Sequence, residues 1–327
     1  IEVFPMPPCA RDTAWTSVTK ARKAGIVPTR SMSGFDSSEC ITSSLNEGRA
    51  IRTLTDKVVV VTGAASGIGR ALASQLAHKG SILALVDINA TELEVTRKAI
   101  TAAGGRATTH NADVASQEQV RRMSAEVIKR HGTVHAVVNN AGADLIERFD
   151  TVKYEDMEWV MGVNFWGTIY VTRAFLDHLV GHDEAHLVNV SSVMGLKGTA
   201  LQTIYAASKF AVRGFTESLK QELRGTGVTV SCVYPGVVDT NLVLHARLAE
   251  QIDRDAMLRS FQAQALRSAP EAAVAIVKGI LGGKERILIG ADARLLDRLQ
   301  RLFPTSYDRV MSSPVLRKVT AALWGTK

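Results

Sequence analysis

The feature that most constrains this chain is the glycine-rich stretch Thr62-Gly63-Ala64-Ala65-Ser66-Gly67-Ile68-Gly69. It follows an unbroken apolar run, Val58 to Val61, and leads into residues 70–77, where apolar residues recur at helical spacing. The pattern predicts a buried strand, a tight turn and a helix in succession. A phosphate can approach the main chain only where no Cβ intervenes, and a helix N-terminus offers it unpaired N–H groups. The turn is therefore either a dinucleotide site with the spacing G-x-x-x-G-x-G or a purely structural loop.

The end of the next apolar run favours the dinucleotide interpretation. Residues 81–86 are apolar apart from Ser81, and Asp87 follows them directly. A carboxylate at the tip of a second strand can accept hydrogen bonds from both hydroxyls of an adenosine ribose, and it repels a 2′-phosphate. Ser66 and Ile88 place no cation in the glycine loop or just after Asp87. The sequence thus predicts NAD as the cofactor in preference to NADP.

Strands and helices are expected to alternate from Asp56 onward. The expected strands are Val58–Val61, Ile82–Val86, Ala107–His110, Ala136–Val138, His186–Val190, Thr229–Val233 and Arg286–Ile289, and the expected helices lie near 67–78, 91–103, 116–131, 154–180, 203–224 and 269–281. Such alternation predicts an α/β fold, a doubly wound (Rossmann) sheet of about seven parallel strands with helices on both faces. Ligands bind at the carboxyl ends of the strands in such sheets.

Polar residues follow the third and fourth strands of this pattern. Asp113-Val114 suits an adenine contact, and the alternative is that Asp113 caps the next helix. The run Asn139-Asn140-Ala141-Gly142 would let the chain pass close under a cofactor while its amides pin neighbouring strands. The alternative there is an ordinary polar turn.

A second candidate group follows the fifth strand. Ser192 stands just after it, and Tyr205 and Lys209 lie four residues apart in a predicted helix, where they share one face. A phenol is a poor base at neutral pH, but a neighbouring ammonium stabilises the phenolate and lowers its pKa. The pair suggests proton transfer, and the alternative is an ordinary surface pair.

Taken together these motifs resemble the short-chain dehydrogenase/reductase family in its single-domain form. The matching residues are Thr62-Gly63-x-x-x-Gly67-x-Gly69, Asp87, Asp113, Asn139-Asn140-Ala141-Gly142, Asn164, Ser192, Tyr205-x-x-x-Lys209 and Pro235-Gly236-x-x-x-Thr240. They occur in family order between about Asp56 and Gly290. The resemblance implies hydride transfer between a secondary alcohol or ketone and NAD(H).

The resemblance also implies residue roles. Tyr205 would exchange a proton with the substrate oxygen, Ser192 would hydrogen-bond that oxygen, and Lys209 would bind the nicotinamide ribose and lower the pKa of Tyr205. Asn164 would hold a water that links Lys209 to solvent; its structural alternative, a polar residue that kinks its helix, is compatible with that role. The implied cofactor-binding residues are Gly63, Ser66, Gly67, Ile68, Gly69, Asp87, Asp113, Val114, Asn140, Ala141, Gly142, Tyr205, Lys209, Pro235, Gly236, Val237 and Thr240. Among them, Val237 and Thr240 would contact the nicotinamide carboxamide.

The substrate side is the least determined part of the sequence. Residues 241–268 carry scattered apolar side chains, of which Leu244, Leu248 and Ile252 would share one helical face, and we interpret the segment as a lid. A hydrophobic alcohol or ketone is expected. The predicted pocket residues are Val193, Met194, Leu196, Leu242 and Leu244.

The ends of the chain are expected to lie outside the domain of residues 56–290. Residues 1–55 have little periodicity and are expected to be mostly disordered, whereas residues 291–327 form a basic amphipathic extension. Its apolar side is expected to pack on a neighbouring subunit or over the substrate cleft, with contact to an anionic membrane surface as the less favoured alternative. We also expect a homodimer or homotetramer, by analogy with the family, through the helix that carries Trp159, Met161 and Trp166.

Composition excludes several classes of function. The net charge of +7 is concentrated in the two terminal segments, so we expect no nucleic-acid partner. The three cysteines are too few and too scattered for a disulfide framework or a metal site, and a reducing, cytoplasmic setting is expected. Two alternatives to a dehydrogenase remain, a non-catalytic NADH-binding sensor and a lyase or epimerase that uses NAD transiently. The presence of both Tyr205 and Lys209 disfavours the sensor, and the short C-terminal extension disfavours the lyase or epimerase.

Overall fold

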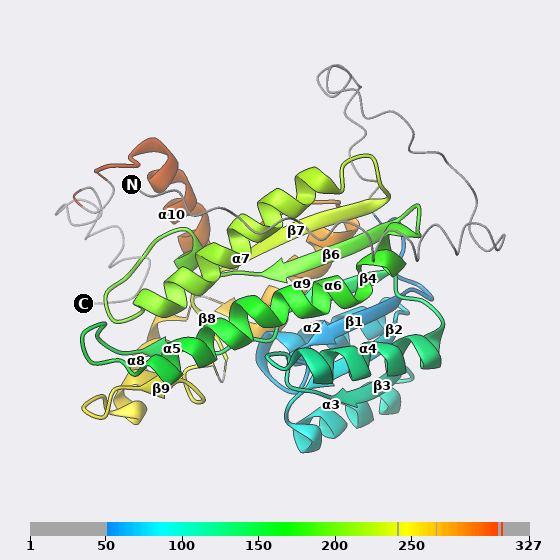
Figure 1. The fold of residues 1–327 in the computed structure, drawn as a ribbon, viewed down its shortest axis with the longest axis horizontal. Helices are drawn as coiled ribbons and strands as arrows, with labels where there is room; N and C mark the ends of the chain where they lie inside the picture. Colours follow the sequence, from blue (N-terminus) through cyan, green and yellow to red (C-terminus); the bar gives the residue numbers. More distant parts are fainter. Residues whose placement is uncertain (1–50, 241, 266, 307–308, 310–327) are drawn as a thin grey trace, which may run out of the picture. The chain divides into compact units, whose positions relative to one another are not determined.

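A single parallel sheet organises the molecule. The computed structural model describes residues 51–240, 242–265, 267–306 and 309 (Figure 1). Seven parallel strands occur in the spatial order β11-β7-β6-β4-β1-β2-β3. Their bounds are β1 Val58–Thr62, β2 Ile82–Asp87, β3 Arg106–Asn111, β4 Ala136–Asn139, β6 Ala185–Val190, β7 Val228–Pro235 and β11 Arg286–Ile289. All seven expected strands are present, with small shifts at their ends.

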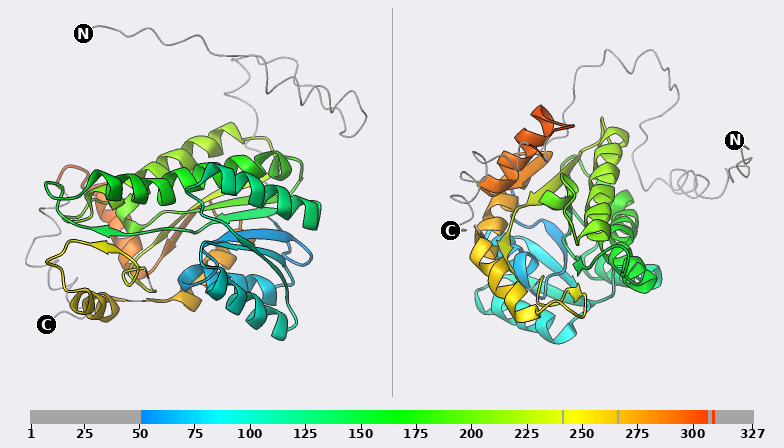
Figure 2. Two further views of the ribbon diagram at one scale, coloured as in Figure 1. Left: turned by 60° about the horizontal axis from the view of Figure 1, so that its bottom comes forward. Right: turned by 90° about the vertical axis from the view of Figure 1, so that its left-hand side faces the viewer.

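Helices cover both faces of the sheet, as the alternating pattern predicted (Figures 1 and 2). The helices are α2 Gly67–His78, α3 Ala90–Ala102, α4 Gln117–His131, α5 Tyr154–Met161, α6 Gly167–Val180, α7 Thr203–Glu222, α8 Arg254–Gln264, α9 Ala269–Leu281 and α10 Ala291–Leu302. One core cluster joins α2, α3 and α9 to the sheet, and a second joins α4, α6 and α7 to the opposite face. The fold is therefore a three-layer α/β sandwich.

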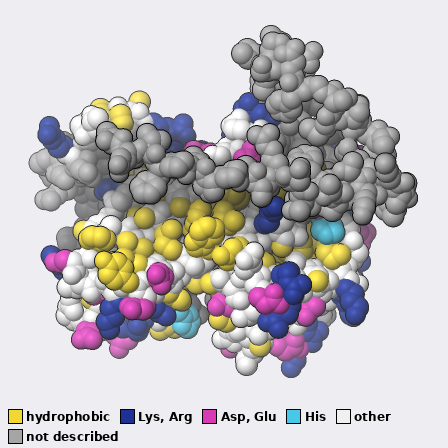
Figure 3. Space-filling view, viewed as in Figure 1, with side chains coloured by type: hydrophobic (Ala, Val, Ile, Leu, Met, Phe, Trp, Pro, Cys, Tyr) yellow, Lys and Arg dark blue, Asp and Glu magenta, His cyan; other side chains and the backbone are white. Residues whose placement is uncertain are grey.

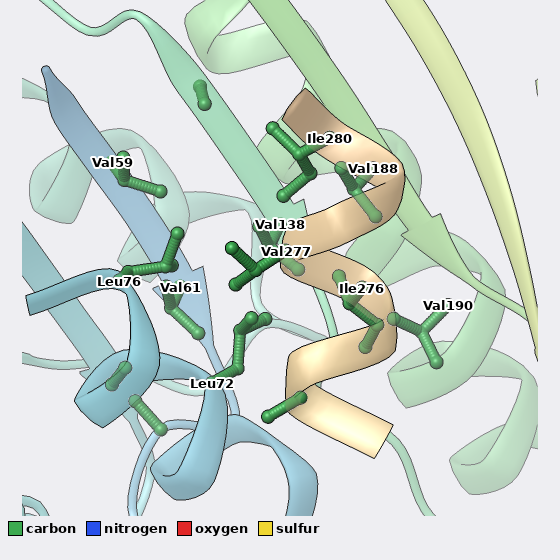
Figure 4. Close-up of a cluster of buried hydrophobic side chains, with 14 of the residues drawn as sticks. Val59, Val61, Leu72, Leu76, Val138, Val188, Val190, Ile276, Val277 and Ile280 are labelled. Carbon is green, nitrogen blue, oxygen red and sulfur yellow. The ribbon is translucent and has the colours of Figure 1, made fainter. Parts of the chain in front are cut away.

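The apolar runs explain why the central strands are buried on both faces. Every residue of β1 is buried, and its neighbours β2 and β4 both pair with it in parallel. Figure 4 shows Leu72 of α2 and Ile276 and Val277 of α9 packed against valines of β1, β4 and β6. A strand covered by helices on both faces has no polar face, and so it reads as continuous valine.

The strand order places the candidate motifs together. The chain builds outward from β1 to β3, then crosses back to β4 and builds outward in the other direction to β11. Adjacent loops therefore diverge between β1 and β4, and such a reversal opens a crevice at the carboxyl ends of the strands. The glycine turn follows β1, and the Asn139-Asn140 turn follows β4 at the same edge.

The expected long helix over 154–180 is interrupted in its middle. A π-helical turn, η2 Gly162–Trp166, separates α5 from α6. Asn164 is the buried residue of this turn, so the structure confirms that Asn164 lies at an irregularity in the helix. Such π turns free backbone groups from the regular ladder, and they occur often at functional sites.

The segment 241–268 differs from the expected helical lid. Two short parallel pairs form here, β8 Val238–Asp239 with β10 Arg267–Ser268 and β5 Leu145–Ile146 with β9 Arg247–Leu248. The expectation that Leu244, Leu248 and Ile252 share a helical face is wrong, because the backbone is extended at Leu248 and α8 begins only at Arg254. The amide of Arg247 donates to the carbonyl of Asp144 (3.0 Å), which holds the strand.

Both predicted extensions contribute to the core where the structure describes them. Ile51 and Leu54 are 0% and 2% exposed in the cluster beneath α2, so the folded domain begins before Asp56. Residues 1–50, most of the expected disordered segment, lie outside the described residues, as do 310–327. Helix α10 buries Ala293 and Leu296 against the rest of the chain. This agrees with the prediction that the apolar side of this segment packs on protein. In the part of the chain that the structure describes, no helix is long and apolar enough to cross a membrane.

Candidate active site

The turn between β1 and α2 is shaped by three glycines. Gly63 and Gly67 have φ angles of +66° and +50°, which side chains rarely adopt. A Cβ at Gly69 would collide with the Gly63 carbonyl and with the amide of Asn140. The Asn140 Nδ2 donates to the carbonyls of Thr62 (3.0 Å) and Gly63 (3.3 Å). The prediction that this amide pins a neighbouring strand end is confirmed.

The first turn of α2 fits a phosphate. Its N-cap residue, Ser66, makes no side-chain capping bond, whereas Asn89 and Ser116 cap α3 and α4 with their side chains. The first N–H groups of a helix have no partner within the helix. Those of Gly67, Ile68 and Gly69 are thus the groups that a pyrophosphate could bind.

Asp87 lies at the end of β2, beside the glycine turn. Its two carboxylate oxygens accept hydrogen bonds from the amides of Ala65 (2.9 Å) and Asn89 (2.9 Å). The sequence argument overlooked a cation here. The Arg70 guanidinium donates to the Ala65 carbonyl and forms an ion pair with Glu92 (2.6 Å). Its position directly after Gly69 was the signal that could have identified it.

Asp113 does not cap the following helix. The N-cap residue is Ser116, and Asp113 instead accepts from the amide of Ala115 (2.9 Å). The capping interpretation is therefore wrong. Val114 is buried and packs on Gly167, where an added Cβ would lie 2.8 Å from a Val114 methyl group. This contact explains why a glycine follows the π turn.

Tyr205 and Lys209 are both buried on one face of α7. Each is 5% exposed, and the Lys209 Nζ lies 5.8 Å from the centre of the Tyr205 ring. The Lys209 ammonium donates to the carbonyl of Val190 (3.3 Å), at the end of β6. Ser192 hydrogen-bonds the Tyr205 side chain, and its own Oγ accepts from the amide of Met194 (3.1 Å). The structure thus brings the predicted Ser, Tyr and Lys together.

Burial dominates the electrostatics of this group. It raises the pKa of Tyr205 above its ordinary value, the Asp144 carboxylate raises it further, and the Ser192 hydrogen bond lowers it. Burial also lowers the pKa of Lys209 to about 8. Lys209 was expected to lower the pKa of Tyr205. The pKa is raised instead, because desolvation of the phenolate outweighs every attractive contact.

Asp144 is a charged residue of the site that sequence reasoning missed. It is 3% exposed and accepts hydrogen bonds from the Leu145 amide (2.8 Å) and from the Gln202 side chain (3.1 and 3.2 Å). Gln202 directly precedes α7, so this contact ties the loop after β4 to the helix that carries Tyr205. Burial raises the pKa of Asp144 to about 6, and Lys209 opposes the shift. An aspartate between Ala143 and Leu145 was the available signal.

The side chain of Asn164 has protein partners on every side. Its Oδ1 accepts from the Ala143 amide (2.8 Å), and its Nδ2 donates to the Ala143 carbonyl (2.9 Å) and to Ser208 Oγ (2.9 Å). The adjacent Gly142 fits between Asn164 and Lys209, since an added Cβ would lie 3.2 Å and 3.3 Å from their side-chain atoms. Asn164 therefore fixes the loop after β4 on α7.

The turn after β7 lies opposite the glycine turn. Pro235 ends β7, and the Val237 amide donates to Asp292 Oδ2 (3.0 Å) of α10. Thr240 faces Gly67, where an added Cβ would lie 3.3 Å from the Thr240 Cβ. The predicted cofactor residues after β1 and after β7 thus meet across the edge of the sheet.

Only part of the predicted substrate pocket is assembled. Met194 packs both in the apolar cluster around Tyr205 and in the cluster under α10, whereas Val193 contacts only the second. Leu196 is wrong as a pocket residue, because it is fully buried with Cys232 and Tyr234. Leu242 and Leu244 join neither cluster, and Leu244 is 41% exposed. The apolar residues that sequence reasoning missed around Tyr205 are Leu145, Val152, Trp159, Val160 and Ile204.

Comparison with known proteins agrees with this geometry. A family model described as short chain dehydrogenase matches residues 57–251. SadH of Mycobacterium tuberculosis, whose assignment as an oxidoreductase is provisional, is 39% identical over 264 residues, which cover 80% of this chain and 96% of SadH. Human 17-beta-hydroxysteroid dehydrogenase 13 is 30% identical over 270 residues, which cover 80% of this chain and 84% of that protein.

Solved structures give the same result. A short-chain dehydrogenase/reductase from Burkholderia phymatum, in complex with NAD, superposes with a TM-score of 0.72 and 29% identity, covering 81% of this chain and 98% of that one. Levodione reductase superposes with a TM-score of 0.66 and 26% identity, covering 74% of this chain and 98% of its own.

Proposed function

The chain belongs to the short-chain dehydrogenase/reductase family and is an oxidoreductase, and from that premise we propose that it interconverts a hydrophobic secondary alcohol and its ketone with NAD(H). The observation that carries the proposal is the buried group of Ser192, Tyr205 and Lys209 at the carboxyl edge of the sheet. This edge is where a dinucleotide lies in doubly wound folds.

The residues divide the proton chemistry among them. Tyr205 takes the proton from the substrate hydroxyl in oxidation and returns it in reduction, while Ser192 holds the substrate oxygen beside the phenol. Lys209, with a pKa of about 8, is mostly cationic at neutral pH and offers its charge to the phenolate and to the ribose hydroxyls. Asn164 holds the loop beside this group through its bonds to Ala143 and Ser208, and it is the residue that would hold a water linking Lys209 to solvent.

The residues present fit a nicotinamide dinucleotide. The uncapped first turn of α2 suits the pyrophosphate, and the Asp87 carboxylate suits the adenosine ribose. When bound, NAD supplies the hydride acceptor that the side chains lack. Arg70 is already paired with Glu92, so it does not offer a free charge to a 2′-phosphate. These contacts support NAD in preference to NADP.

The surroundings of Tyr205 support a hydrophobic substrate. Leu145, Trp159 and Ile204 pack with Tyr205, and Met194 joins them. An apolar wall stabilises the carbon skeleton of a substrate. A preference for small polyols or sugars over apolar secondary alcohols would contradict this part of the proposal.

The expected oligomer would use the face that α5 and α6 present. Figure 3 shows hydrophobic side chains gathered across the middle of this face. Trp166 is 48% exposed and stacks on Tyr170, whereas Trp159 packs toward Tyr205 and under Arg247. Exposed aromatic side chains of this kind are common at protein interfaces. The contact proposed for a homodimer therefore centres on Trp166.

The test measures turnover of a panel of secondary alcohols with NAD and with NADP, and the absorbance of the reduced nicotinamide reports the turnover. Tyr205→Phe removes only the phenolic oxygen, and we expect turnover to fall by about 10²- to 10⁴-fold, because a general acid–base contributes that much. NADH binding should change little. Tyr154→Phe is the matched control, since Tyr154 is 78% exposed at the start of α5.

The outcomes also separate the alternatives. Equal turnover in wild type and Tyr205→Phe would refute the assigned role of Tyr205. NADH binding without turnover on any alcohol or ketone would instead favour a sensor, and turnover of substrate without net change in NADH would favour a lyase or epimerase.

A further inference from the structure

A carboxylate from α10 is buried at the turn that follows β7. Asp292, in the first turn of α10, is 3% exposed, and its Oδ2 accepts from the amide of Val237 (3.0 Å). Its other oxygen, Oδ1, is buried without a hydrogen-bond partner. Burying a carboxylate with one unpaired oxygen costs free energy. This cost suggests that Asp292 has a role besides the docking of α10.

Two glycines make room for this carboxylate. An added Cβ at Gly236 would overlap the Asp292 carboxylate, and one at Gly290 would collide with its Oδ1. Gly290 also has a φ of +102°, which brings the chain from β11 directly into α10. The turn and the start of the helix therefore both pack closely on the Asp292 side chain.

The same helix contacts the segment that carries the substrate-side residues. Ala293 and Leu296 pack against Val193, and Met194 and Leu288 lie against them. Val193 directly follows Ser192, whose Oγ accepts from the Met194 amide. Helix α10 thus touches the loop after β6 through its apolar side chains and the turn after β7 through Asp292.

We propose that Asp292 is a positioning residue that fixes the Pro235–Thr240 turn in the orientation that receives the nicotinamide end of the cofactor. The inference rests on the proposed function and deepens it, because it assigns a role in cofactor binding to a helix beyond the residues 57–251 that match the family model. By holding the Val237 amide, Asp292 determines where the following residues, including Thr240, face the cofactor.

Two ligands separate this role from general stability. NADH carries the nicotinamide, and ADP-ribose lacks it while keeping the adenosine and pyrophosphate. Binding of both to the full-length protein is measured by calorimetry, together with the melting temperature. We expect Asp292→Ala to weaken NADH binding at least about tenfold and to leave ADP-ribose binding within about twofold. Asp292→Asn keeps an oxygen for the Val237 amide and should restore most of the NADH affinity.

Asp297 provides the matched control. It is 8% exposed on the same helix and pairs with Arg286 and Arg301, but it makes no contact with the turn. Asp297→Ala should lower the melting temperature and keep both affinities within about twofold. Equal losses of NADH affinity in the two alanine variants, or equal losses of NADH and ADP-ribose affinity in Asp292→Ala, would overturn the proposal. Absence of NADH binding in wild type would instead refute the proposed function itself.

Discussion

The two halves of the carboxyl edge of the sheet differ in how exposed their ionisable side chains are and in where their partners lie in the sequence. On the nucleotide side, Asp87 and Asp113 are partly exposed, and each accepts from an amide two residues farther along the chain. On the catalytic side, Asp144, Tyr205 and Lys209 are at most 5% exposed. Their partners come from distant parts of the chain, as with Gln202 and Asp144. Under the proposed function, the first half presents groups to the nucleotide, whereas the second keeps water away from the groups that exchange protons.

This difference has a physical consequence. Exposed carboxylates interact with a ligand through contacts that salt screens, so changing them should alter affinity and selectivity. Buried groups shift their pKa values through desolvation, so changing them should alter pH dependence and stability. Each prediction below tests one side of this contrast.

The largest effect is expected from Gly69→Ala on the nucleotide side. The new Cβ would collide with the Gly63 carbonyl and the Asn140 amide, which are backbone and a pinned side chain. The turn must open, and we expect NADH affinity to fall by more than about 100-fold, with destabilisation of about 2–4 kcal/mol. Isothermal titration and thermal unfolding measure the two quantities.

Gly214→Ala is the control for that change. Gly214 lies in the middle of α7, and an added Cβ would meet no atom within 4 Å. Alanine favours a helix over glycine, so this variant should be more stable by about 0.5–1 kcal/mol with unchanged NADH affinity. An unaltered NADH affinity in Gly69→Ala would show that the tight turn does not shape the pyrophosphate site.

The next effect concerns stability on the catalytic side. The pKa of Asp144 is about 6 in the folded protein against an ordinary value of 3.8 for an aspartate side chain, so the folded state binds the proton more tightly. Its contribution to stability is therefore fully present below pH 4 and is lost as the pH rises through 6. The full loss corresponds to about 3 kcal/mol. Asp144→Asn should raise the melting temperature at pH 8 and leave it nearly unchanged at pH 4.

The same variant should shift the pH profile of turnover. The Asp144 carboxylate raises the pKa of both Tyr205 and Lys209, so removing its charge should move the profile of alcohol oxidation toward lower pH, by about half to one unit. A melting temperature that rises equally at pH 4 and pH 8 would mean that packing, and not buried charge, limits stability at this position.

The sequence predicts the nucleotide side better than the catalytic side. The turn after β1 is visible because a tight turn with positive φ angles strongly favours glycine, and the strands are visible as valine runs. The seven-stranded sheet could be predicted for the same reason. An aspartate between Ala143 and Leu145 suggests a buried charge, but the roles of Asp144 and Asp292 could not be assigned from local sequence, because their partners Gln202 and Val237 lie far away in the chain. The short strand at Leu248 was also missed, because its pairing with β5 outweighs the apparent helical spacing.

The smallest effect is expected from Asp87→Asn, which tests the selectivity of the nucleotide side. Removing the charge relieves repulsion of a 2′-phosphate, and we expect the ratio of kcat/KM for NAD to that for NADP to fall roughly tenfold. The fall should be smaller at high salt, because the carboxylate is partly exposed. Asp113→Asn is the matched control, since it should affect NAD and NADP alike. A wild type that prefers NADP, or a ratio that does not respond to Asp87→Asn, would place the selectivity in Arg70 and Glu92 instead. In that case Glu92→Gln would increase the use of NADP, because it releases the Arg70 guanidinium from its 2.6 Å ion pair.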